Sequence, residues 1–463
     1  MQGNFFAFTV LTAWIPFSYW VFRRYPQLQA CLICILAGTL FLPSTELDAP
    51  LLPPLDRAAI PFLTAYLGAR WSGKAWKARA LGALPRALFW LTLIGIALNV
   101  ASNGQAIIMP NKVLPAIQPY EGLSMAFRLF ATMLGPFLLG YAVVRRPEDL
   151  GVVLAVLVGA ALIYSLPIIY EIVMSPRLHK IIYGFRQHSF AQTKRFGGWR
   201  PMVFMGHGLE VAMFMTSALL AAAGLARARL GGKLGTGRVV LYLLVVAIAC
   251  KSMATWFYMT AALPLIWALS SKGQMRVAVV IAWFVLAYPG LRLLDALPTE
   301  AFVDQMAELS PERAQSLGFR FDMEDVTIEH ANQRFLSGWG RFGRALVYDR
   351  RTGEQESVPD GLWLVTYAGR GMLGVIGTFG LLLVPVLIAS RRLGRIRVPG
   401  HRMCVSVLSL VVTFTALDFL PNGSVNSITF FLPGALLGAV TAVTPSGRRA
   451  PPTSAARDAG STA

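Results

Sequence analysis

The chain alternates long apolar stretches with short polar segments along almost its whole length. A membrane-spanning helix needs about 20 mostly apolar residues, and this pattern predicts about 12 to 14 such helices. Two of the stretches, 57–69 and 238–251, are short, which leaves the number open. The predicted spans are 5–22, 28–43, 57–69, 86–102, 123–144, 150–172, 207–226, 238–251, 253–271, 276–294, 361–389, 402–419 and 427–444.

Composition supports this interpretation. Hydrophobic residues make up 55% of the chain and charged residues 14%, against roughly 25% charged in soluble domains. A soluble protein this apolar could not cover its own surface with polar groups. We therefore expect an all-α integral membrane protein, a polytopic helical bundle.

Charge predicts the orientation in the membrane. The net charge is +19, which in a soluble protein would suggest binding to nucleic acid. Here the basic clusters lie in short loops, at every second loop between predicted spans. Lys and Arg mark cytoplasmic loops, so these loops are predicted to be cytoplasmic and the N-terminus to lie outside. Nucleic acid is excluded as a partner, because no single basic surface gathers these charges. The small, polar segment 445–463 is predicted to be a disordered cytoplasmic tail.

Two loops on the predicted outer side divide the chain further. The loop at about 173–206, within the N-terminal helices of 1–294, is basic, and no acid occurs between Glu171 and Glu210. This suggests an anionic ligand, with contacts to lipid headgroups as the alternative. The loop 295–360 carries 13 of the 23 acids against seven Arg, a net charge of −6, and shows helical patterning broken at Pro311. Helices of 361–444 follow it.

Four segments of this chain, taken in order, carry a resemblance to a known family. The first is RPMVFMGHGLEVAMFM (200–215), and the second is the turn at Lys251. The third is SLGFRFDMEDVTIEHANQRFLSGWG (316–340), and the last is PDGLWLVTYAGRGMLGVIG (359–377). Over roughly 120–440 the chain resembles the bacterial O-antigen ligase and O-antigen polymerase (Wzy-type) superfamily. It departs from the family pattern at Gly208, Lys251 and Gly361, which leaves the substrate details open.

The resemblance implies a GT-C-like fold with a large periplasmic loop, in the bacterial inner membrane. It implies a metal-independent glycosyltransferase without a cofactor, which moves a glycan from undecaprenyl pyrophosphate to an acceptor hydroxyl at the periplasmic face. We expect polymerisation of exopolysaccharide or O-antigen repeat units, with a chain-length regulator as a possible partner. The alternatives are an O-antigen ligase, whose acceptor is lipid A–core, and a flippase of lipid-linked oligosaccharides.

This transfer needs cations to stabilise the leaving pyrophosphate and a group to accept the hydroxyl proton. The resemblance and a position at the membrane boundary or inside a span select the pyrophosphate-binding candidates, which are Arg200, Lys251, Arg320, Arg186 and Arg128. Arg320 could instead form a salt bridge with Asp322 or Glu324, and Asp360, a candidate base, could instead be a helix N-cap. The candidate bases are Asp360, Glu210 and His207.

Two further features complete the sequence-based expectations. Asp418 and Asn422, near the outer end of a predicted span, could bind sugar hydroxyls. Four glycines recur every three residues in the span 361–389, at positions 371, 374, 377 and 380. This spacing predicts close packing of neighbouring helices.

Overall fold

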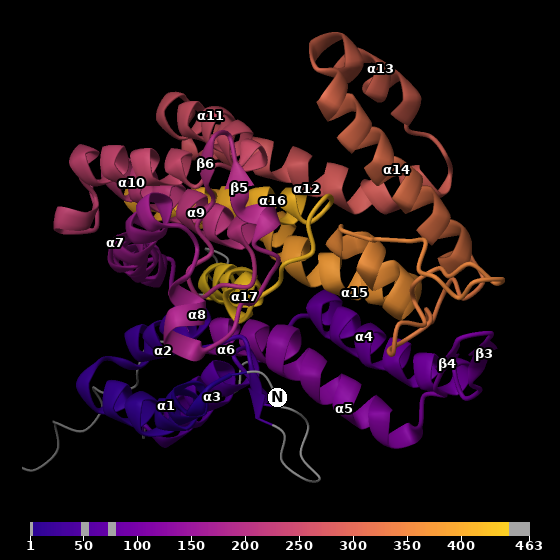
Figure 1. Cartoon of the computed structure of the whole chain (residues 1–463). Coiled ribbons are helices and arrows are strands. Elements are labelled where there is room, and N and C mark those ends of the chain that lie inside the picture. Colours follow the sequence, from indigo (N-terminus) through magenta and orange to yellow (C-terminus); the bar gives the residue numbers. More distant parts are fainter. Residues whose placement is uncertain (1–2, 48–54, 73–79, 444–463) are drawn as a thin grey trace, which may run out of the picture.

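The computed structural model describes residues 3–47, 55–72 and 80–443, and most of these are helical (Figure 1). The strands of this part of the chain form three short antiparallel hairpins. They are β1 (Glu46–Leu47) with β2 (Leu55–Asp56), β3 (Ile107–Met109) with β4 (Lys112–Leu114), and β5 (Lys194–Arg195) with β6 (Gly198–Trp199). The predicted tail 445–463 lies outside the described residues.

Each predicted apolar stretch is helical, and the helix ends differ from the prediction by only a few residues. They are α1 (Phe5–Arg24), α2 (Gln27–Phe41), α3 (Ala59–Trp71), α4 (Ala83–Ser102), α5 (Pro119–Leu129), α6 (Gly135–Val143), α7 (Asp149–Met174), α8 (Leu178–Tyr183), α9 (Gly208–Ala228), α10 (Gly237–Ala249), α11 (Met253–Ala268), α12 (Ser271–Leu293), α13 (Thr299–Leu309), α14 (Pro311–Asn332), α15 (Leu362–Arg392), α16 (Pro399–Asp418) and α17 (Ser427–Thr441). Of these helices, α8, α13 and α14 lie in the two predicted outer loops. A π-helical turn, Phe130–Leu134, joins α5 to α6.

Eight helices in the described part of the chain are long and apolar enough to cross a membrane, counting α5–α6 as one, and four further apolar helices are shorter. The prediction of an all-α, multi-pass membrane protein is confirmed at this level. Helices α13 and α14 lie on either side of Pro311, where the sequence pattern predicted a break.

The C-terminal helices form the centre of the bundle. In Figure 1, α17 lies between the N-terminal helices α1–α3 and the group α9–α12, and α16 lies among that group. Helix α9 is the most enclosed of the candidate spans, with 89% of its apolar window buried. Its small residues allow this, because α16 packs so close that a Cβ on Gly224 would lie 2.7 Å from the Val407 side chain.

Helix α15 is interrupted inside its apolar stretch. Gly371 has φ 64° and ψ −172°, so the first turns, 362–370, and the remainder are two helices joined at a kink. Only glycine adopts this backbone conformation without strain. A Cβ here would also lie 2.3 Å from the carbonyl carbon and oxygen of Leu336.

The segment 335–340 satisfies the backbone groups that this break leaves without helical partners. The amides of Trp339 and Gly340 donate to the carbonyls of Ala368 (2.8 Å) and Gly369 (2.9 Å), and the Met372 amide donates to the Phe335 carbonyl (2.7 Å). Irregular backbone at membrane depth is stable only where protein supplies such partners.

Asn99 of α4 joins the same assembly. Its Nδ2 donates to the carbonyls of Ser337 (2.6 Å) and Gly369 (2.9 Å). The next polar residue on this helix face, Asn103, donates to the carbonyl of Gly338 (3.0 Å). Asn99 and the C-cap Asn103 of α4 therefore bind the last carbonyl region before the break and the segment that pairs with it.

The glycine spacing predicted helix packing, and this is confirmed further along α15. Cβ atoms on Gly377 and Gly380 would lie 2.1 Å from the Thr92 hydroxyl oxygen and 2.7 Å from the Leu88 side chain, both on α4. For Gly371 the prediction was wrong, because its role is to let the helix break and to admit the Leu336 backbone.

We expect Gly371→Ala to destabilise the protein, because the left-handed backbone is strained by about 1–3 kcal/mol for a non-glycine residue and the added methyl overlaps Leu336. The apparent melting temperature of the detergent-purified protein measures this. Gly159→Ala in α7 is the matched control, since its Cβ would meet nothing within 4 Å. Equal melting temperatures for the two variants would contradict the described role of the break.

Candidate functional site

Several loops meet at one end of the bundle, which we call the loop end; it comprises 55–58, 196–207, 333–361 and 419–426. Asn426 Nδ2 donates to Glu210 Oε1 (2.9 Å), and Arg57 lies 3.4 Å from Glu210 Oε2. Arg320 Nη1 donates to the Pro421 carbonyl (3.4 Å). The segment 419–426 thus contacts both the basic loop and the acidic loop of the sequence.

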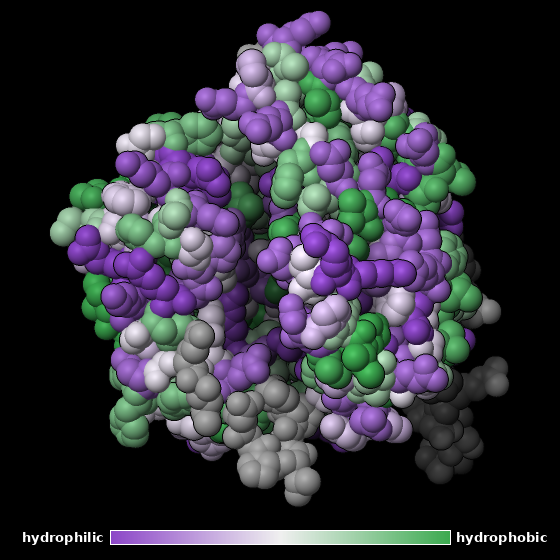
Figure 2. Space-filling view, turned by 45° about the vertical axis from the view of Figure 1, so that its right-hand side comes forward, coloured by the Kyte–Doolittle hydropathy of each residue, from purple (hydrophilic) through white to green (hydrophobic). Residues whose placement is uncertain are grey.

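Three cavities surround this segment, and successive residues of it face different ones. Asn422, Ser424 and Asn426 line one cavity, Gly423 and Val425 line the second, and Leu420 and Pro421 line the third. We call them the carboxylate, arginine and aromatic pockets after the residues described below. Figure 2 shows a deep hollow in one face of the molecule, with hydrophilic residues along its sides.

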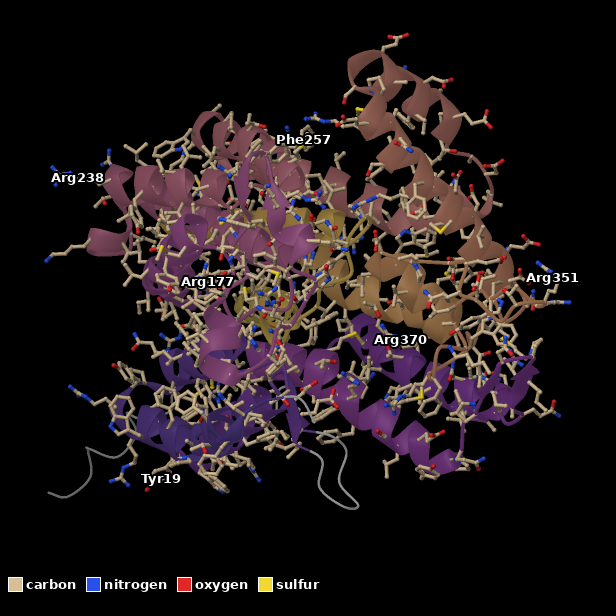
Figure 3. The ribbon with its side chains drawn as sticks, in the orientation of Figure 1. Tyr19, Arg177, Arg238, Phe257, Arg351 and Arg370 are labelled. Atoms are coloured by element: carbon tan, nitrogen blue, oxygen red, sulfur yellow. The ribbon has the colours of Figure 1, made fainter. Side chains whose placement is uncertain are left out.

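The arginine pocket, of about 430 Å³, contains three guanidinium groups. They belong to Arg128 at the end of α5, to Arg341, and to Arg370 one residue before the break in α15. The other lining residues are neutral, and most are apolar side chains such as Ile96 and Leu129. Figure 3 places Arg370 beside α4 and α5, near the middle of the molecule.

Arg370 is the least satisfied of the three. Its Nη2 donates to the hydroxyls of Thr366 (3.1 Å) and Thr378 (3.3 Å). Its Nη1 is shielded from solvent and has no hydrogen-bond partner among the described residues. An unpaired donor of a buried charge is costly, so this group is suited to receive an anionic ligand.

The other two guanidiniums are held at the rim of the pocket. Arg341 Nη1 donates to the Ser124 hydroxyl (3.2 Å). Arg128, with 58% of its side chain exposed, lies 3.6 Å from both Glu46 and Asp56. These two acids offset part of the charge of Arg128, and the pocket remains cationic.

Sequence reasoning found Arg128 but missed Arg341 and Arg370. Arg370 carried a usable signal, because an ionisable residue inside an apolar span points to function by default. The surrounding glycines directed attention to helix packing instead. Arg341 carried no comparable signal, since it is one of seven Arg in an acidic loop.

The aromatic pocket, of about 610 Å³, brings together two predicted site residues, Arg320 and Asp360. Asp360 is exposed and makes no hydrogen bond or ion pair with other described residues. It precedes the N-cap of α15, which is Gly361, so Asp360 is not the capping residue that the alternative interpretation required.

The alternative for Arg320, a salt bridge within α14, is not observed. Glu324 Oε2 instead accepts from Arg292 Nε (2.9 Å), and Glu324 also accepts from Tyr288 and Trp363. Arg292 reaches Asp325 as well (2.6 Å). These contacts fix α14 against α12 and α15, and they leave the Arg320 side chain on the wall of the pocket.

The carboxylate pocket is small, about 60 Å³, and contains Glu210 and Asp418. Both Glu210 oxygens are occupied, because Oε2 also accepts from the Gly206 amide (3.0 Å). Asp418 Oδ1 accepts from Asn422 Nδ2 (2.9 Å). A cavity of this size holds water molecules but no sugar, so Glu210 here ties loops together.

Four other predicted site residues lie in the basic loop or against it, outside the lining of the three pockets; they are Arg186, Arg200, Lys251 and His207. Arg200 donates from Nε and Nη2 to the Lys251 carbonyl (3.2 and 3.1 Å), and Lys251 Nζ donates to the Phe196 carbonyl (3.5 Å). The Arg186 guanidinium lies 4.3 Å from the centre of the Phe190 ring. These are contacts that shape the loop, and they occupy the Nε and one Nη2 donor of the five N–H donors of Arg200.

His207 caps the first turn of α9, where its Nδ1 accepts from the Leu209 amide (3.1 Å). Burial, together with the nearby His188 and Arg200, lowers the pKa of His207 to about 4. Burial, with Arg195 nearby, lowers the pKa of Arg200 to about 10. His207 is therefore neutral at physiological pH, as its capping role requires.

Within the described residues, no group of three or more His, Cys, Asp or Glu is placed to hold a metal ion. Neither a family model nor a curated protein matches this chain. The resemblance noted in the sequence therefore depends on its motifs alone.

His207 generates a pH prediction. Its pKa is lower in the folded state than the ordinary value of 6.5, so the unfolded chain binds more protons between pH 6.5 and 4, and stability falls as the pH falls through that window. His207→Asn keeps a capping side chain without titrating. We expect its melting temperature to fall less between pH 6.5 and 4 than that of the wild type; parallel profiles would contradict the buried neutral imidazole.

Proposed function

We propose that this chain is a membrane glycosyltransferase of GT-C-like fold. It transfers a glycan from a polyprenyl diphosphate, of the undecaprenyl type, to an acceptor hydroxyl at the loop end, which is then the periplasmic face of a bacterial inner membrane. The observation that carries the proposal is the arginine pocket, with the unpaired Nη1 of Arg370 among apolar walls. The order of the sequence motifs supports the same reaction.

The donor chemistry fits this pocket. A diphosphate presents several anionic oxygens, and guanidinium groups bind such oxygens through paired hydrogen bonds. The apolar side chains of α4 and α5 in the pocket wall suit the hydrocarbon chain of the lipid. In a water-poor site, cations fixed in advance stabilise the charge that develops on a leaving diphosphate.

Asp360 is the proposed base. The acceptor oxygen attacks the anomeric carbon of the first donor sugar, and the bond from that carbon to the diphosphate oxygen breaks. The electron pair leaves with the diphosphate, next to Arg370, Arg341 and Arg128, and the hydroxyl proton passes to the Asp360 carboxylate. The first turn of α15 borders both pockets, since Leu362 lines the arginine pocket and Asp360 the aromatic pocket.

The roles of the other sequence candidates are assigned by their contacts. Arg200, Lys251, Arg186 and His207 shape the basic loop, and Glu210 joins that loop to Arg57 and Asn426. They are positioning residues in this proposal, whereas Arg320 lies on the wall beside Asp360.

Polymerase activity is the preferred form of the reaction, with ligase activity as the second candidate. The large loop 295–360 closes over the aromatic pocket, which a flippase would not need. Loss of a polymerase leaves single repeat units on lipid at the periplasmic face, whereas loss of a flippase strands them on the cytoplasmic side.

We expect Arg370→Gln to abolish polymer formation in cells, by about 100-fold or more, because one donor aimed at developing charge contributes about 10²–10³ to the rate of a comparable reaction. Polymer and lipid-linked single repeats are measured together. Arg351→Gln is the control, an exposed arginine at the edge of the molecule (Figure 3). Normal polymer levels in a correctly inserted Arg370→Gln variant would overturn the pocket assignment.

Asp360→Asn tests the base separately. It keeps size and polarity but cannot accept the proton, so we expect a loss of about 10²–10⁴-fold in transfer rate with donor binding unchanged. The neighbouring acid Glu356, which is also exposed, provides the control variant Glu356→Gln. A loss in Asp360→Asn that comes from weaker donor binding would contradict its role as base.

A further inference from the structure

The aromatic pocket has a composition that the proposed transfer does not by itself require. Six aromatic side chains line it, from the three helices α11, α12 and α14: Phe257, Tyr258, Phe284, Tyr288, Phe319 and Phe321. Phe257 and Phe319 are 66% and 52% exposed. Large exposed rings around a cavity form a surface for a ligand with flat apolar faces.

Polar groups stand among these rings. Arg320 and Asp360 offer a fork of donors and a free carboxylate, and both line the same cavity as the exposed rings. Ring faces together with hydrogen-bonding groups match a sugar ring, which has C–H groups on its faces and hydroxyls around its edge. A hydrocarbon chain would leave the Asp360 carboxylate without a partner, at a cost in free energy.

The place of the pocket also favours a sugar. Helix α14 covers it, and the acids of the loop 295–360 outnumber its arginines by 13 to seven. These carboxylates repel phosphate groups, and they accept hydrogen bonds from uncharged hydroxyls. The segment 419–426 and the first turn of α15 border both this pocket and the arginine pocket, and Asp360 lines the aromatic pocket.

We infer that the aromatic pocket binds the terminal sugars of the acceptor glycan and presents one hydroxyl to Asp360. This rests on the proposed function, and it names the second substrate of the same site as an uncharged oligosaccharide end. At about 610 Å³, the cavity lies within the usual size of ligand pockets, about 300–1,000 Å³. The exposed ring of Phe319 is the stacking platform.

The test uses the full-length protein and Phe319→Ala, with Phe319→Trp as the conservative variant. Phe302→Ala is the matched control, since Phe302 is 49% exposed on α13 and lies outside the pocket lining. The donor is the host strain's own lipid-linked glycan. The acceptor probe is the oligosaccharide that mild acid releases from that same lipid.

We expect Phe319→Ala to raise the KM for the oligosaccharide by roughly tenfold, which is about 1.4 kcal/mol, while the donor KM and the limiting rate stay unchanged. Phe319→Trp should restore the KM, and Phe302→Ala should leave it unaltered. An unchanged acceptor KM in Phe319→Ala overturns the inference. So does a raised donor KM, which would assign the pocket to the lipid.

A second readout separates this inference from the proposed function. Binding of the same oligosaccharide to the purified protein is measured by calorimetry, with no donor present. If the wild type transfers no sugar yet binds the oligosaccharide, and Phe319→Ala abolishes binding, the proposed function fails and the sugar site stands. If the wild type transfers sugar but Phe319→Ala binds the oligosaccharide normally, the sugar site fails and the proposed function stands.

Discussion

The backbone of α15 breaks at Gly371, and the rest of the loop end depends on how that break is satisfied. A helix inside a membrane cannot leave amides and carbonyls without partners. Here the segment 335–340 supplies them, with bonds from Trp339 and Gly340 to the carbonyls of Ala368 and Gly369. A long loop that sequence reasoning treats as surface is thereby fixed to the middle of a spanning helix.

This pairing also brings the charges together. The Gly340 amide donates to the Gly369 carbonyl, so the residues that follow them, Arg341 and Arg370, come to line the same cavity. Arg344 anchors the loop from the other side, since its Nη1 donates to the carbonyls of Gln105 (2.8 Å) and Pro115 (3.0 Å). The cationic pocket follows from the same backbone contacts that stabilise the break.

The apolar pattern predicted the helices well, because span length and hydrophobicity are local properties of the sequence. The paired helices around Pro311 and the packing at Gly377 and Gly380 were predictable for the same reason. The grouping of Arg341 with Arg370 was not, since it depends on hydrogen bonds between segments 30 residues apart. The spacing of the glycines was informative, but it did not distinguish a packing glycine from one with positive φ.

The site residues also divide into those that the sequence identified and those whose role depends on three-dimensional contacts. The sequence selected Asp360 and Arg320 as separate candidates for base and pyrophosphate binding, and they line one pocket. It also selected Arg200 and Lys251 for pyrophosphate binding, and here Arg200 uses two of its donors on the Lys251 carbonyl, outside the three pockets. Residue type and position alone do not reveal which guanidiniums are already satisfied, whereas the three-dimensional contacts do.

The central claim is that the arginine pocket binds a lipid-linked diphosphate, and equilibrium binding of a short-chain prenyl diphosphate to the purified protein tests it most directly. The account predicts saturable binding that weakens as salt rises, is competed poorly by the prenyl alcohol, and is lost in Arg370→Gln but kept in Arg351→Gln. Equal affinity of the wild type and Arg370→Gln for the prenyl diphosphate would contradict it.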